Sequence, residues 1–196
     1  MNEIMIDREK YYKDDYEGFA IFLITRAYND LQINTTLFNK VKGDASYEAQ
    51  IYFFKLLTAH LKETLKILGT IKRSDRFTGI MAKWENNVLV KRILLEIADE
   101  LENPRNKPNT INAKYLNFRN EVFHYCIESK DFQEDLKQKN MNVLVSKNKK
   151  GQYEHEVGVD IQISQGIFNE KTIEEVDRLR RKVQTILREI LNDYLI

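Results

Sequence analysis

The segment 118–125 reads FRNEVFHY and combines an arginine, an asparagine and a histidine, which are Arg119, Asn120 and His124. On a helix that turns about 100° per residue, Arg119 falls at the centre of an apolar face, and Asn120 and His124 stack four residues apart on its flank. One helical turn therefore offers a permanent cation, an amide and an imidazole. An imidazole can transfer protons near neutral pH, and a guanidinium can stabilise charge that develops on phosphate oxygens.

Two structural explanations compete with this chemistry. A buried arginine is usually paired with a carboxylate of another helix, because an unpaired buried charge costs several kcal/mol. A histidine on the flank of an apolar face is more often a satisfied structural residue than a catalyst. The spacing of Arg119 and His124 alone leaves both explanations open.

The elements that would position these residues are mainly helical, because apolar residues recur three and four apart along most of the chain. The last helix is expected to begin with Thr172 and Glu175, which have the spacing of a capping box. Short connections favour an antiparallel helical bundle of about five helices. The predicted helices are 14–32, 47–71, 77–101, about 109–139, and Thr172 onwards.

The hydrophobic period changes to two in 153-YEHEVGVDIQI-163, which predicts a half-buried strand. Its expected partner is 141–146, and Gly151 in the intervening segment suits a tight hairpin turn. The sequence thus predicts a small β-hairpin insertion over 141–163. An isolated hairpin is marginally stable, so its apolar face is expected to pack on the bundle or on another subunit.

Length and composition bound the class of protein. The 196 residues suit a single domain, 1–196, and the net charge of +1 is too small for a protein held on nucleic acid by bulk electrostatics. The single cysteine, Cys126, excludes an intrachain disulfide and favours a reducing compartment. The N-terminus lacks the apolar core of a signal peptide, and no stretch has the ~18 apolar residues of a membrane span. We expect a cytoplasmic protein without a membrane partner.

The pattern Arg119-x4-His124, with Asn120 directly after the arginine, resembles the motif of the HEPN superfamily. The context agrees with this resemblance, since the motif lies in the middle of the penultimate long helix and a long helix ends the chain. The resemblance covers roughly 14–139 and 170–196, and it gives no account of the hairpin. The superfamily includes ribonuclease toxins and abortive-infection proteins of bacteria.

The resemblance implies a metal-independent endoribonuclease of a toxin or phage-defence (antiviral, abortive-infection) system, with Arg119 and His124 as catalytic residues and Asn120 as an orienting residue. It also implies a composite site across a homodimer, no cofactor, and an antitoxin protein as a further partner. One branch, the toxins paired with nucleotidyltransferase antitoxins, has a tyrosine two residues after the histidine. Cys126 occupies that place here, so the abortive-infection type is the better fit.

Basic clusters are the best candidates for contacts with RNA phosphates, although such clusters are usually solvated faces. A non-catalytic module that binds RNA or a protein with the same bundle is the alternative function. His60 and His155 are interpreted as structural, and neither has a convincing metal-ligand spacing. The candidate RNA-binding residues are Lys147, Lys149, Lys150, Arg178, Arg181 and Lys182.

Overall fold

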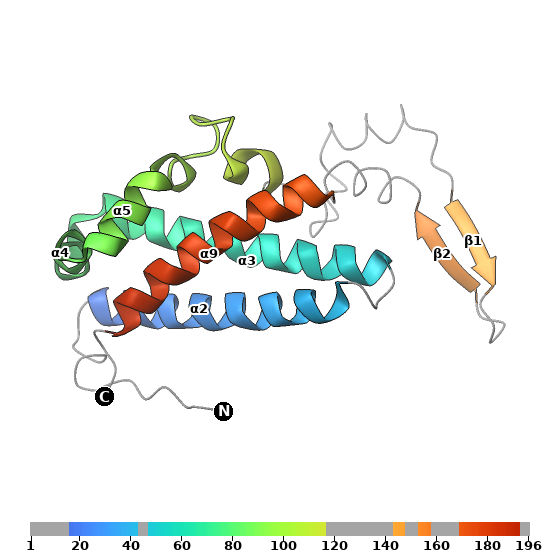
Figure 1. Cartoon of the computed structure of the whole chain (residues 1–196), viewed down its shortest axis with the longest axis horizontal. Helices are drawn as coiled ribbons and strands as arrows, with labels where there is room; N and C mark the ends of the chain where they lie inside the picture. The colour runs from blue at the N-terminus through green and yellow to red at the C-terminus, as the bar shows by residue number, and fades with distance from the viewer. Residues whose placement is uncertain (1–15, 43–46, 117–142, 148–152, 158–168, 193–196) are drawn as a thin grey trace.

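The computed structural model describes residues 16–42, 47–116, 143–147, 153–157 and 169–192. Over these ranges the chain is mainly helical, and its helices pack as a bundle, which confirms the helical part of the predicted fold. Figure 1 shows α2 and α3 side by side and running in opposite directions, with α9 crossing both. The helices are α2 (Tyr16–Val41), α3 (Tyr47–Arg73), α4 (Thr78–Asn86), α5 (Val88–Glu96) and α9 (Glu170–Asn192).

The core lies where α2, α3 and α9 meet, and α4 and α5 close it at one end. Its residues recur three and four apart on each helix, so each helix turns one apolar stripe inward. Every aliphatic side chain that is fully buried in this way contributes about 1.5–3 kcal/mol. The fully buried residues include Ile21, Ile24, Leu31, Leu61, Leu65, Leu68, Ile186 and the large Trp84. None of the helices that the structure describes combines the length and the apolar character needed to cross a membrane.

The helix predicted over 77–101 is wrong as a single element. The chain forms a 3-10 turn η1 (Asp75–Phe77), then α4, α5 and a second 3-10 turn η2 (Ala98–Leu101). The break falls at Asn87, whose Oδ1 accepts hydrogen bonds from the backbone N–H groups of Leu89 and Val90, both at 3.1 Å. An asparagine side chain that caps a new helix competes with continuation of the old one.

The predicted start of the last helix is also corrected. Helix α9 begins at Glu170, and the Oδ1 atom of Asn169 accepts a hydrogen bond from the backbone N–H of Thr172 at 3.0 Å. Asn169 is therefore the capping residue, while Thr172 is buried inside the first turn. Asparagine caps helices at least as well as threonine, so the earlier start is favoured.

Two short strands pair within the segment that the sequence analysis assigned to a hairpin. β1 (Val143–Lys147) and β2 (Tyr153–Val157) are antiparallel, with Val145 opposite His155. The predicted turn at Gly151 and the ends of the range 141–163 lie outside the described residues.

Gly69 on α3 marks the closest approach between α3 and η2. A Cβ atom at this position would lie 2.6 Å from the backbone carbonyl oxygen of Leu101, which also accepts a hydrogen bond from Nη1 of Arg73 at 2.8 Å. We expect Gly69→Ala to lower the free energy of unfolding by about 1–2 kcal/mol, because overpacking outweighs the better helix propensity of alanine. Urea denaturation would measure this, with the adjacent exposed Thr70→Ala as control, and a stabilised Gly69→Ala protein would contradict the prediction.

Candidate functional site

Most of the residues that the sequence predicts to be functional lie outside the described part of the chain. These are Arg119, Asn120 and His124 of the motif, and Lys149 and Lys150 of the basic cluster. Lys147 ends strand β1, where its backbone is opposite Tyr153. The structure therefore describes two parts of the predicted site. These are the segment that leads into the motif, up to Leu116, and the basic residues of α9.

The helix predicted to carry the motif begins in the π-helical turn η3 (Asn112–Leu116), which packs against α3. Its first residues are fixed by Glu100 of η2. The Glu100 carboxylate accepts hydrogen bonds from the backbone N–H groups of Ile111 at 2.9 Å and of Asn112 at 2.7 Å. The side-chain amide of Asn112 donates to the backbone carbonyl of Glu100 at 2.9 Å. Oγ1 of Thr110 accepts a hydrogen bond from the N–H of Ala113 at 3.1 Å, in agreement with the predicted helix start near Asn109 or Thr110. The predicted course of this helix beyond Leu116 lies outside the described residues.

A salt bridge between Lys107 and Asp99 joins the loop between η2 and η3 to η2. Nζ of Lys107 lies 2.8 Å from Oδ1 of Asp99, although both side chains are largely exposed. The hydrogen bond to Asp99 raises the pKa of the Lys107 ammonium above its ordinary value, with a further contribution from the charge of the same carboxylate. The contact joins the loop to η2, from which the chain leads into η3.

We expect Glu100→Gln to lower the free energy of unfolding by about 1–2 kcal/mol. A glutamine offers one acceptor oxygen in place of two and has no charge, so one buried backbone N–H at the start of η3 loses a charge-assisted hydrogen bond. Chemical denaturation would measure the loss, with Glu85→Gln on the exposed side of α4 as a matched control. Equal stability of the two variants would show that Glu100 does not hold the start of this helix.

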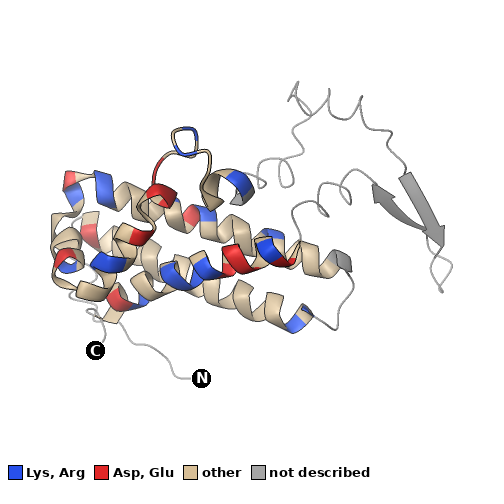
Figure 2. Ribbon diagram, turned by 45° about the horizontal axis from the view of Figure 1, so that its top comes forward, with Lys and Arg blue, Asp and Glu red and all other residues tan. Residues whose placement is uncertain are grey.

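The side chains of the basic cluster 178-RLRRK-182 point to different faces of α9, so they differ in burial. Arg178 and Arg181 are exposed, as expected for residues that contact RNA. Lys182 is partly buried, and its Nζ forms an ion pair with Oε2 of Glu96 on α5 at 3.0 Å, so it also joins two helices. Arg180 is buried, since it lies on the apolar stripe of α9 between Val176 and Val183. In Figure 2 basic and acidic positions are interspersed along the described helices, with other residues between them.

Buried Arg180 organises the polar residues on this side of α9. Its Nε and Nη2 donate to Oδ1 of Asp177 at 2.8 and 2.6 Å, and its Nη1 donates to Oε1 of Gln184. The other carboxylate oxygen of Asp177 accepts from Nε of Arg181 at 2.8 Å. A chain of hydrogen bonds therefore runs from Gln184 through Arg180 and Asp177 to the exposed Arg181.

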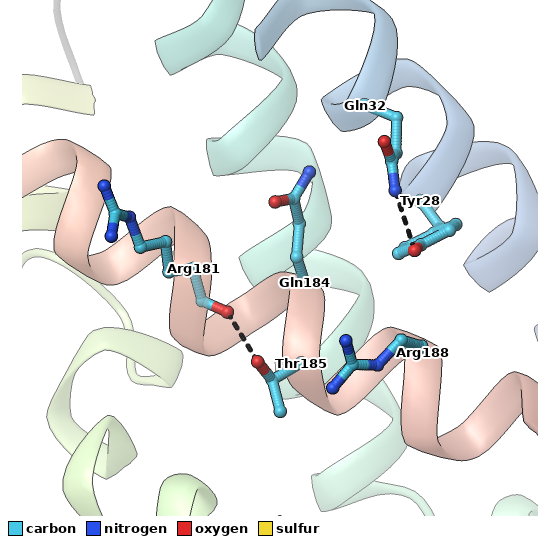
Figure 3. A pocket seen from close by; sticks show the side chains of 6 residues that line it. All are labelled: Tyr28, Gln32, Arg181, Gln184, Thr185 and Arg188. Carbon is cyan, nitrogen blue, oxygen red and sulfur yellow. Dashed lines mark hydrogen bonds between the residues drawn. The ribbon is translucent and has the colours of Figure 1, made fainter. Parts of the chain in front are cut away.

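Gln184 and Arg181 of this chain of hydrogen bonds line a pocket of about 300 Å³ between α2 and α9, which we call the α2–α9 pocket. Figure 3 shows side chains from both helices around it. Oη of Tyr28 accepts a hydrogen bond from Nε2 of Gln32 at 2.7 Å, and Oγ1 of Thr185 donates to the carbonyl of Arg181 at 3.0 Å. The lining residues are Tyr28, Gln32, Arg181, Gln184, Thr185 and Arg188.

The pocket lining is polar and carries cations but no carboxylate. Two acidic side chains contact the arginines from outside the lining, Asp177 at Arg181 and Glu189 at Arg188, where Oε1 of Glu189 lies 3.3 Å from Nη2. With buried Arg180 included, the pocket and its immediate surroundings contain three arginines and two carboxylates, which is an excess of one positive charge. A pocket of this kind favours an anion over a cation.

His60, interpreted from the sequence as structural, is half-buried on α3 and contacts an acidic side chain of α2. Its Nδ1 atom lies 3.5 Å from Oδ2 of Asp30, which is also 3.9 Å from Nε of Arg26. This contact joins the two longest helices, in agreement with a structural role. His155 lies on strand β2, where only its backbone pairing is described. Within the described ranges no group of three or more His, Cys, Asp or Glu side chains could hold a metal ion.

Sequence reasoning identified only Arg181 among the six residues that line the pocket and missed the other five. Arg188 stands seven residues after Arg181, which places both on one face of α9, and this spacing was a usable signal. Tyr28 and Gln32 lie on the same face of α2. They come close to Arg181 and Arg188 only because α2 packs against α9, and the sequence does not show this packing. Comparisons with protein-family models, with curated proteins and with solved structures each find no match for this chain.

Proposed function

We propose that this protein is a metal-independent endoribonuclease of a bacterial toxin or abortive-infection system. The observation that carries the proposal is the pattern Arg119-Asn120-x3-His124 in a chain whose described residues form mainly a helical bundle. The pattern resembles the catalytic motif of the HEPN superfamily, and the mainly helical fold agrees with that resemblance. The two-stranded segment around β1 and β2 is then an insertion between the motif helix and α9.

The reaction begins with the 2′-hydroxyl of the RNA as the nucleophile. This oxygen loses its proton and bonds to the adjacent phosphorus, and the bond from phosphorus to the 5′-oxygen breaks. The products are a 2′,3′-cyclic phosphate and a 5′-hydroxyl, which receives a proton. His124 acts as the general base or acid in these proton transfers, and Arg119 stabilises the negative charge on the non-bridging oxygens.

In this proposal the active site is shared by two subunits. A homodimer would bring two copies of His124 and Arg119 to one phosphate, and thereby supply an acid, a base and two cations. Asn120, beside the arginine, orients the phosphate or the imidazole. The protein acts in the cytoplasm, where its RNA substrate is found, and an antitoxin protein restrains it.

A second candidate function is a non-catalytic module that binds RNA or a partner protein. The α2–α9 pocket favours this candidate in its RNA-binding form, because Arg181 and Arg188 can contact phosphate and none of the residues described as lining the pocket is a motif residue. Under this alternative Arg119 is ion-paired and His124 is a structural residue.

Cleavage of RNA by the purified protein in excess EDTA separates the two candidates. The proposal predicts fragments with cyclic-phosphate and 5′-hydroxyl ends, and a rate that depends on protein concentration in the range where dimers form. Absence of cleavage together with tight RNA binding would favour the binding module. Cleavage that requires an added divalent metal ion would contradict the proposed mechanism.

A further inference from the structure

We propose that the α2–α9 pocket binds a phosphate of a single-stranded RNA backbone, with Arg181 and Arg188 as its cationic ligands. The inference deepens the proposed function, because it takes RNA as the ligand and places one of its contacts on the described helices. It does not depend on whether the chain cleaves that RNA.

The two arginines retain donors that can reach a ligand. Nε of Arg181 is occupied by Asp177, but among the described residues none accepts a hydrogen bond from its Nη1 or Nη2 atoms. Nε and Nη2 of Arg188 share one oxygen of Glu189, both at the long distance of 3.3 Å, which leaves Nη1 without a partner in the described ranges. Both side chains are well exposed, so the cost of desolvating them before binding is small.

The spacing of the arginines suits a backbone with repeated phosphates. Seven residues of α-helix advance about 10.5 Å, and both side chains emerge on the same face of α9. Long, flexible side chains at this separation can converge on one phosphate or contact two. Guanidinium groups are well suited to phosphate oxygens because their planar donors bond in pairs.

Neutral donors of the pocket are held in position by bonds already made. Oε1 of Gln184 accepts from buried Arg180, so the Nε2 end is left for a ligand, and Figure 3 shows that end turned toward α2. Oη of Tyr28 accepts from Gln32, which leaves its own O–H to donate. Because Arg180 also holds Asp177, and Asp177 holds Arg181, a buried network orients two of the groups that face the ligand.

The size of the pocket limits the ligand. About 300 Å³ is at the lower end of small-molecule sites, enough for one phosphate with part of its nucleotide. The remaining strand must then run over the surface, where the mixed charges of the described helices offer no broad basic path. Binding through a single such contact is therefore expected to be moderate and strongly dependent on salt.

The test is fluorescence anisotropy with a labelled single-stranded RNA of about 12 nucleotides, in a His124→Ala background that prevents cleavage. Arg181→Gln and Arg188→Gln are each expected to raise Kd at least about five-fold and to reduce the salt slope by about 0.7, the value for one lost phosphate contact on a single strand. Arg92→Gln, which removes an exposed arginine on α5, is the matched control and should change Kd less than about two-fold. Thermal unfolding of each variant confirms that the fold is intact.

The outcomes distinguish this inference from the proposed function. If the wild-type protein cleaves RNA but the two pocket variants bind as tightly as the control, the pocket inference is overturned and the nuclease proposal stands. If the wild-type protein does not cleave RNA but the variants lose affinity, the inference stands and the nuclease proposal fails. Displacement by inorganic phosphate of a small-anion probe, without measurable RNA binding, would assign the pocket to a free anion and overturn the inference.

Discussion

Replacing His124 by alanine is expected to lower the rate of RNA cleavage by a factor of about 10²–10⁴, the usual contribution of a general acid or base. The loss should appear in kcat, because the imidazole acts on protons that move in the transition state. The affinity for RNA should change little. Single-turnover cleavage of a labelled RNA in EDTA measures the chemical step directly.

The matched control is His60→Ala, because His60 is half-buried against Asp30 and lies on a different helix from the motif. Its cleavage rate should equal that of the wild-type protein. Arg119→Lys extends the test, since lysine keeps the charge but loses the paired donors that fit a phosphate, and it should also be severely impaired. Equal rates for the His124→Ala and His60→Ala proteins would exclude His124 from the reaction.

The second large effect is expected on the stability of the fold, through the pair formed by Asp177 and buried Arg180. Asp177→Asn is expected to lower the free energy of unfolding by about 2–3 kcal/mol, because it leaves the buried charge of Arg180 without its carboxylate. Removing one partner of a fully buried pair costs about 3–5 kcal/mol, and the lower figure applies because the Asp177 side chain is 32% exposed. Equilibrium denaturation in urea measures the difference.

Arg180→Met gives the decisive comparison. Methionine has nearly the same length and fits the apolar stripe, so this variant should be within about 1 kcal/mol of the wild-type stability. The double variant, Arg180→Met with Asp177→Asn, should be more stable than Asp177→Asn alone. If the loss of unfolding free energy in the double variant equals the sum of the losses in the two single variants, Asp177 acts through a contact other than Arg180.

The long helices could be predicted only where their apolar residues keep one period. Helix α2 was predicted over 14–32 and extends over Tyr16–Val41, so its last nine residues were missed. Helix α3 was predicted over 47–71 and extends over Tyr47–Arg73. The split between α4 and α5 was not predicted, since both stripes are apolar and only the cap at Asn87 separates them. Val88 follows the buried Trp84 by four residues, the spacing of one helical face, yet it is 82% exposed because the chain breaks at Asn87. Local capping chemistry overrides periodicity at such points.

The site could be predicted only in part, for a physical reason. The sequence contains the spacing along each helix, so Arg181 was identified, and the burial of Arg180 follows from the same periodicity. It does not contain the pairing of helices, which brings Tyr28 and Gln32 to α9. Lys182 was assigned to RNA binding for its charge, but its partner Glu96 is more than eighty residues away in the chain. The motif residues Arg119, Asn120 and His124 stay a prediction.

The Glu100 carboxylate has a consequence for the direction in which the motif faces. Its two oxygens receive two successive backbone N–H groups, those of Ile111 and Asn112, so it fixes the rotational phase of the helix that begins there. Each residue of slippage would turn the following side chains by about 100° around the helix axis. For a helix that continues from η3 through the motif, as the sequence predicts, a one-residue deletion between Asn112 and Arg119 would redirect the arginine and histidine together. The same deletion in the loop before Ile111 would leave their direction unchanged.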